Sequence, residues 1–169
     1  MDRPALFARL ARHRDVFRAL LSGLPPEEYR WKPAPGKWCI LEVVCHLRDE
    51  EREDFGARLR STLHTPERSW PKIDPVAWVT ERRYMEQDFG TVLDEFLAER
   101  ERTVLWLRSE RDGSWQNAYA HPTVGPVSCD LLLANWVAHD LHHIRQINNL
   151  RYGYLAAIST VPLDYAGEW

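Results

Sequence analysis

Residues 137–146, with the sequence VAHDLHHIRQ, carry the strongest structural signal in this chain. They place His139 and His143 four positions apart in a stretch with helical periodicity. The two imidazoles therefore diverge by only ~40° and lie about one turn apart on one face. Neutral imidazole is the commonest metal ligand in proteins, and this spacing suits two ligands on one transition-metal ion. Because the motif supplies only two ligands, a metal site needs a third from elsewhere in the chain.

The same helical face is apolar on both sides of the motif, which predicts that both histidines point into the protein. The residues that share this face are Leu132, Trp136, Ile147 and Leu150. The alternative is a pair of core histidines with hydrogen-bonded rings and no metal. Such a pair would have to find partners for four ring nitrogens in a dry core. Asp140 points elsewhere on the helix, to the surface or to another helix.

Apolar periodicity and helix-end signals predict four helices, over about residues 4–21, 40–63, 81–110 and 128–150. Asp2 and Ser128 are the expected N-caps of the first and the fourth. The charges between Arg48 and Arg60 indicate an exposed face of the second helix. Four helices without alternating strands predict an all-α four-helix bundle, formed by residues 1–169 as a single domain.

The connections between these helices are rich in proline and glycine. Long loops are expected between the second and third helices, over 64–79, and between the third and fourth, over 113–127. Residues 114–119 are a candidate for one short strand. The apolar and aromatic tail over 152–169 is expected to pack against the protein rather than extend into solvent.

Composition excludes several classes of protein. The net charge of -3, without a clustered basic patch, argues against a nucleic-acid partner. No apolar run approaches the ~18 residues of a membrane-spanning helix, so no membrane partner is expected. The three cysteines form no C-x-x-C pair, and the first residues lack the apolar run expected of a signal peptide. These features predict a cytoplasmic protein. Eight tryptophans favour pockets or interfaces lined by aromatic rings.

Five further histidines are candidates for the third ligand: His13, His46, His64, His121 and His142. His46 lies inside the second predicted helix, from which a side chain can reach a facing helix of a bundle. His13 lies near an apolar face of the first helix and is a weaker candidate. His64 and His121 fall in predicted loops, and His142 points about 100° away from the motif's inward face. The residue pattern alone leaves this choice open.

Two motifs in this order resemble the DinB/YfiT-like superfamily of metal-binding four-helix-bundle proteins. The first is Gly36-Lys37-Trp38 followed by Ile40-Leu41-Glu42-Val43-Val44-x-His46-Leu47, and the second is residues 139–147, HDLHHIRQI. The resemblance covers about residues 5–150. It implies three histidine ligands, one from the second helix and two from the fourth, which are His46, His139 and His143 here. Many members have glycine where this chain has Arg145, a departure that does not affect the ligands.

Three imidazoles leave open positions on a divalent ion, as catalytic zinc sites do. We expect one divalent transition-metal ion, zinc or nickel first, with iron or manganese as alternatives. Glu50 is the candidate catalytic residue, although a solvated charge on an exposed helix is the usual fate of glutamate. Trp38 and Gln146 are the candidate substrate-binding residues, and Trp38 could instead close the end of the bundle. Cys45 is expected to be a small buried residue.

Characterised relatives include transferases and isomerases that use low-molecular-weight thiols. The resemblance therefore implies a thiol-dependent transferase that acts on small electrophiles through a metal-bound thiolate. A first alternative is a hydrolase that uses metal-bound hydroxide. A second is a non-enzymatic, metal-stabilised stress protein. The expected partners are a small-molecule substrate, a low-molecular-weight thiol and a second copy of the chain. The tail and the 64–79 loop are candidate dimer contacts.

Overall fold

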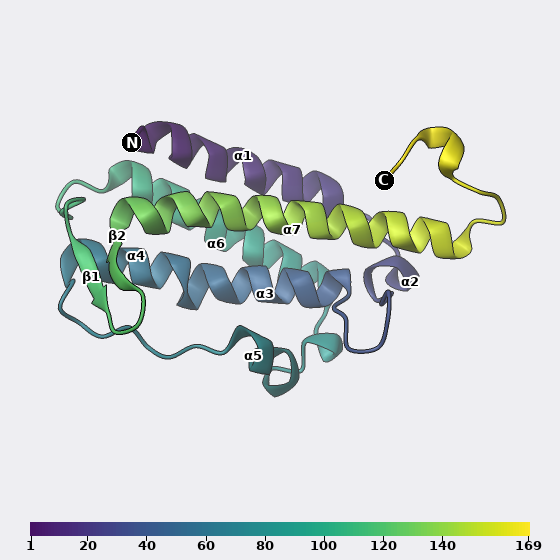
Figure 1. Ribbon diagram of the computed structural model, residues 1–169, viewed down its shortest axis with the longest axis horizontal. Helices are drawn as coiled ribbons and strands as arrows, with labels where there is room; N and C mark the ends of the chain where they lie inside the picture. Colours follow the sequence, from purple (N-terminus) through teal and green to yellow (C-terminus); the bar gives the residue numbers. More distant parts are fainter.

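Four long helical segments lie side by side and form the body of the molecule (Figure 1). The computed structural model describes residues 1–169. The long segments are α1 (Arg3–Leu21), α3 (Ile40–Glu53) continued by α4 (Phe55–His64), α6 (Phe89–Ser109) and α7 (Cys129–Ile158). In Figure 1, α7 lies in front of α6, with α1 above and α3–α4 below. The expected all-α four-helix bundle is confirmed.

Shorter elements lie between these helices and in the C-terminal tail. They are α2 (Pro26–Tyr29), α5 (Pro75–Glu81), the 3-10 turns η1 (Tyr84–Glu86) and η2 (Asp164–Ala166), and the strands β1 (Ala118–His121) and β2 (Gly125–Ser128). The strands pair antiparallel, with Ala118 opposite Ser128. The short strand expected over 114–119 is therefore displaced, and it is half of a hairpin. None of the helices is long and apolar enough to span a membrane.

Polar side chains start the helices where the sequence indicates. Asp2 accepts a hydrogen bond from the backbone N–H of Ala5, and Ser128 accepts one from Leu131, so both expected N-caps are confirmed. Asp88 caps α6 through the N–H of Thr91. The third long helix therefore begins at Phe89. The expected start near residue 81 is wrong, because Arg83 adopts a left-handed conformation (φ 48°) that ends the preceding turns.

Two other helix boundaries differ from expectation. The second helix is broken at Asp54, where φ is -112° and ψ is -96°. The fourth continues past residue 150 to Ile158, so the first part of the tail is helical. The rest of the tail folds back, and Trp169 stacks on Tyr152 with 4.4 Å between the ring centroids. Its indole N–H donates to the Asn149 side chain at 3.1 Å.

The connection over 64–79 also packs against the rest of the chain. Its last part forms α5, which packs on α3. Trp78 is buried in the core, and Trp70 stacks on Tyr119 of β1 with 4.1 Å between the ring centroids. The two tryptophans of this segment are therefore used mainly for packing within the chain.

The interior holds charges as well as apolar side chains. Four consecutive residues expected on an exposed face, Arg48, Asp49, Glu50 and Glu51, are buried. The reason lies on other helices. Arg100 of α6 is 1% exposed and donates from Nε to both carboxylate oxygens of Glu51, at 2.9 and 3.0 Å. Its other two nitrogens donate to Asp140 of α7, at 2.6 and 2.8 Å.

His13 of α1 completes this buried network, because its Nδ1 lies 3.0 Å from Asp140 Oδ2. Burial alone would raise the pKa of Asp140, but the Arg100 guanidinium and the bond to His13 hold it below its ordinary value. The network joins α1, α3, α6 and α7. Asp140 therefore lies between helices and not at the surface, the second of the two places that the sequence allowed.

Replacing Gly56 with alanine should destabilise the fold by about 1–3 kcal/mol, because a Cβ at this position would lie 2.5 Å from the Glu51 carbonyl oxygen. Urea unfolding measures the change. Gly90→Ala is the matched control, since its nearest neighbour would be Asp88 Oδ1 at 3.5 Å, an ordinary contact in the first turn of α6. Equal free energies of unfolding for the two variants would contradict this explanation.

Arg100→Ala should lower the free energy of unfolding by about 3–5 kcal/mol, because it leaves the Glu51 and Asp140 carboxylates buried without a counter-charge. Arg102→Ala is the control. The Arg102 side chain is 62% exposed and pairs with Glu99 on the preceding turn of α6, so its loss should change the free energy of unfolding far less than the loss of Arg100 does. A loss below about 1 kcal/mol for Arg100→Ala would show that the network does not stabilise the bundle.

Candidate metal centre

Three histidines from two facing helices meet at the centre of the candidate site. His46 lies in the middle of α3, and His139 and His143 lie on adjacent turns of α7. Nε2 of His139 is 3.4 Å from Nε2 of His46 and 3.1 Å from Nε2 of His143. The ligand atoms of all three lie within 4.8 Å of one another. The structure thus brings together the three residues that the two sequence motifs single out.

The spacing of these nitrogens fits a small transition-metal ion. Zinc binds imidazole nitrogen at ~2.0–2.1 Å, and two ligands of a tetrahedral ion are then ~3.3 Å apart. The two Nε2 separations, 3.1 and 3.4 Å, lie on either side of that value. No cysteine, aspartate or glutamate adds a ligand atom to the cluster. Three imidazoles on one ion would leave at least one coordination position open.

The three rings are neutral at neutral pH. Burial lowers the pKa of His46 and His139 to about 3, and the neighbouring imidazoles act in the same direction. Burial also lowers the pKa of His143. A neutral imidazole presents a lone pair, which is the form that binds metal ions.

Gln146 orients the ring of His143 by contacting Nδ1, the ring nitrogen that faces away from the cluster. Its side-chain oxygen lies 2.8 Å from Nδ1 of His143, one turn along α7. When Nδ1 carries the proton and donates it to this oxygen, Nε2 is left with its lone pair facing the other histidines. Gln146 therefore acts on the ring of His143. A role of Gln146 in substrate binding stays a prediction.

Glu50 lies beside His46, on the side of the ring that faces away from the cluster. Nδ1 of His46 is buried without a hydrogen-bond partner, and the nearest carboxylate oxygen of Glu50 is 3.8 Å away. Glu50 is only 4% exposed, so the expectation of a solvated charge is wrong. Burial, with a hydrogen bond to Asp54, raises the pKa of Glu50 to about 9. This shift favours the protonated form of the carboxyl.

Two aromatic rings flank the cluster. Trp38, at the entry to α3, lies with its ring centroid 5.1 Å from that of His46. Phe55 lies 5.1 Å from the ring of His139 and stacks on Trp136. The sequence placed Phe55 on the helical period of the second helix but did not indicate that it neighbours the cluster, because its position depends on the break at Asp54. The break redirects the chain and turns Phe55 towards α7.

The other histidines lie elsewhere. His13 belongs to the buried network around Arg100, and His64 bonds to Glu110 at the surface. His121 ends β1, and His142 is exposed on α7. His13 is therefore not part of the cluster. Cys45, next to His46, is fully buried, and burial raises the pKa of its thiol to about 12. It is the inert small residue that the sequence predicted.

Comparisons with known proteins agree with this architecture. Among solved structures, the chain is similar to YfiT from Bacillus subtilis, described as a probable metal-dependent hydrolase with an unusual four-helix bundle topology. The TM-score is 0.78 at 20% sequence identity, and the match covers 89% of this chain and 86% of that chain, which establishes a common fold. A search of the curated proteins found no match. The family model of the DinB superfamily matches residues 9–147, and the chain therefore belongs to the DinB superfamily.

Proposed function

We propose that this protein binds one divalent transition-metal ion through His46, His139 and His143, and that it is a thiol-dependent transferase acting on small electrophiles. The observation that carries the proposal is the convergence of three neutral Nε2 atoms, without a carboxylate or thiol in the cluster. Imidazole ligands favour zinc or nickel, with iron or manganese as alternatives.

A bound divalent ion with an open position would lower the pKa of a thiol or water molecule that occupies it. The chain's own residues prepare that position. Gln146 orients His143, and Glu50 lies against the ring of His46. Trp38 and Phe55 shield the histidine rings from water, which strengthens the interaction between the imidazoles and a cation.

The placement of carboxyl groups favours a thiol over water as the nucleophile. Attack by water is assisted by a base within hydrogen-bond reach of it. Glu50 lies on the Nδ1 side of His46, away from the cluster, and Asp140 is held by Arg100 and His13. A thiol bound to a metal ion is deprotonated without such a base. The site as built therefore suits thiol chemistry.

Metal-dependent hydrolysis is the second candidate. It is favoured by the description of YfiT as a probable metal-dependent hydrolase. It would require the Glu50 carboxyl, or a group of the substrate, to take the proton from water. The two candidates share the same three metal ligands and differ in the nucleophile.

Chelator-treated protein should take up one zinc or nickel ion per chain, measured by elemental analysis after titration and desalting. His143→Ala should abolish stable uptake, because two imidazoles remain. His142→Ala is the matched control, since His142 is exposed on the same helix and outside the cluster, and it should bind like the parent. Gln146→Leu should weaken binding by about 10–100-fold. A chain that takes up no ion at all would refute the metal site.

A panel of low-molecular-weight thiols with a chromogenic electrophile should show metal-dependent conjugation, which His143→Ala abolishes and His142→Ala retains. Hydrolysis of ester or amide substrates without added thiol would instead identify the second candidate. A protein that is inactive in both assays but melts at a much lower temperature after chelation would indicate a non-enzymatic role, in which the ion stabilises the bundle. Gel filtration with light scattering then tests whether that form is the homodimer.

A further inference from the structure

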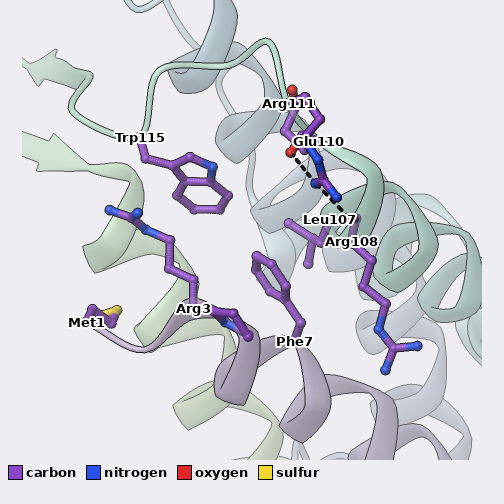
Figure 2. Close-up of a pocket in the computed structure, with 9 residues that line it drawn as sticks. Met1, Arg3, Phe7, Leu107, Arg108, Glu110, Arg111 and Trp115 are labelled. Carbon is purple, nitrogen blue, oxygen red and sulfur yellow. Dashed lines mark hydrogen bonds between the residues drawn. The ribbon is translucent and has the colours of Figure 1, made fainter.

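A pocket lies at the end of the bundle where α1 begins and α6 ends (Figure 2). Its volume is about 410 Å³, within the ~300–1,000 Å³ usual for small-molecule sites. Its principal lining residues are Arg3, Phe7, Leu107, Arg108, Arg111 and Trp115. None of them belongs to the histidine cluster. The pocket is therefore a separate feature of the molecule, and a ligand bound there is independent of the proposed metal chemistry.

The inner wall of the pocket is apolar and partly aromatic. Figure 2 shows Phe7, Leu107 and Trp115 converging from α1, α6 and the segment before β1. Leu107 is buried, whereas Phe7 and Trp115 are half-buried. The two aromatic rings are 5.9 Å apart and tilted by 41°, so they form neighbouring walls and leave their faces partly free. A flat apolar group would cover surface that now meets water.

Guanidinium groups surround this wall. Arg3 is held in place, because Nε and one terminal nitrogen donate to Asp130 at 2.6 and 3.1 Å. Its guanidinium also lies 4.8 Å from the Trp115 ring centroid. The side chain of Arg111 donates only to the backbone carbonyls of Arg108 and Glu110, both at 2.9 Å. Neither the Arg108 nor the Arg111 guanidinium has a carboxylate partner.

Glu110 is the one acidic residue that lines the pocket, and its oxygens are already occupied. One accepts from the backbone N–H groups of Asp112 and Gly113, both at 2.9 Å. The other accepts from Trp106 and lies 3.0 Å from the ring nitrogen of His64. Arg108 and Arg111 therefore remain without a counter-anion, in a chain whose net charge is -3. The local excess of positive charge contrasts with the charge of the whole molecule.

We propose that this pocket binds a small organic anion with a flat apolar body, of the aromatic carboxylate class. The ring would lie against Phe7, Leu107 and Trp115. The carboxylate would meet a guanidinium at the rim that has no carboxylate partner, that of Arg111 or that of Arg108, which lie on different sides of the apolar wall in Figure 2. A guanidinium matches a carboxylate in shape and donor geometry. Purely inorganic anions would leave the aromatic wall uncovered, and neutral aromatics would leave the arginines unpaired.

Isothermal titration calorimetry with 2-naphthoate tests the proposal on chelator-treated protein, because a carboxylate could otherwise bind a metal ion. We expect saturable binding of one molecule per chain. The neutral isostere 2-naphthamide and the small anion acetate should each bind at least about tenfold more weakly. Absence of saturable binding, or equal binding of the amide or acetate, would overturn the proposed ligand class.

Variants locate the site. Arg108→Gln with Arg111→Gln should weaken naphthoate binding at least about tenfold, and both residues are exposed, so the fold should persist. Arg9→Gln is the matched control, an exposed arginine of α1 outside the pocket, and should bind like the parent. The indole N–H of Trp115, assigned in the NMR spectrum with Trp115→Phe, should shift on titration. Binding that survives in the double variant but is lost in His143→Ala would place the ligand at the histidines and reject this pocket.

Discussion

The arrangement of the helices depends on the buried hydrogen bonds that the Arg100 guanidinium donates to Glu51 and Asp140. Fully buried ions are strongly unfavourable unless every donor and acceptor is paired. Arg100 meets this condition only when Glu51 of α3 and Asp140 of α7 both approach it, with His13 of α1 on the far side of Asp140. An apolar core tolerates sliding of one helix along another, whereas five directed hydrogen bonds do not. The network therefore fixes the positions of α1, α3, α6 and α7 along their axes relative to one another.

This constraint reaches the histidine cluster through sequence neighbours. Asp140 follows His139 directly on α7, and Glu51 lies five residues after His46 on α3, so short stretches of the same two helices carry both the ion pairs and the cluster. Once Arg100 fixes the positions of these two helices, it also holds the imidazoles of His46 and His139 close together, with their Nε2 atoms 3.4 Å apart. The three rings are then held with their lone pairs converging, a mutual repulsion that the helices would relieve if they could move apart.

The sequence predicted the elements that depend on local chemistry. The four-residue spacing of His139 and His143, the N-caps at Asp2 and Ser128, and the bundle itself all follow from periodicity and end signals. What it missed depends on residues far away in the chain. The charges from Arg48 to Glu51 resemble a solvated face because their partners lie far along the chain: Glu95 for Arg48, Arg82 for Asp49 and Arg100 for Glu51. The break at Asp54 is local, but it coincides with a close backbone approach at Gly56, which no periodicity records. Phe55 was therefore invisible as a neighbour of the cluster.

Two faces of α7 make contacts near His139, one with the histidine cluster and one with Arg100, and these contacts make the helix intolerant of changes in length. His139 points to the histidine cluster, while Asp140, the next residue, points to Arg100. Inserting or deleting one residue upstream would rotate everything beyond it by about 100°. The imidazoles and the carboxylate would then leave their partners together, and no compensating substitution on one face would restore the other. Insertions can be accommodated in the hairpin before Cys129 or beyond Leu150, where α7 has passed both sites. The part of α7 from Cys129 to Leu150 therefore has to keep its length, and a design that moves the site into another bundle has to transfer this part unchanged.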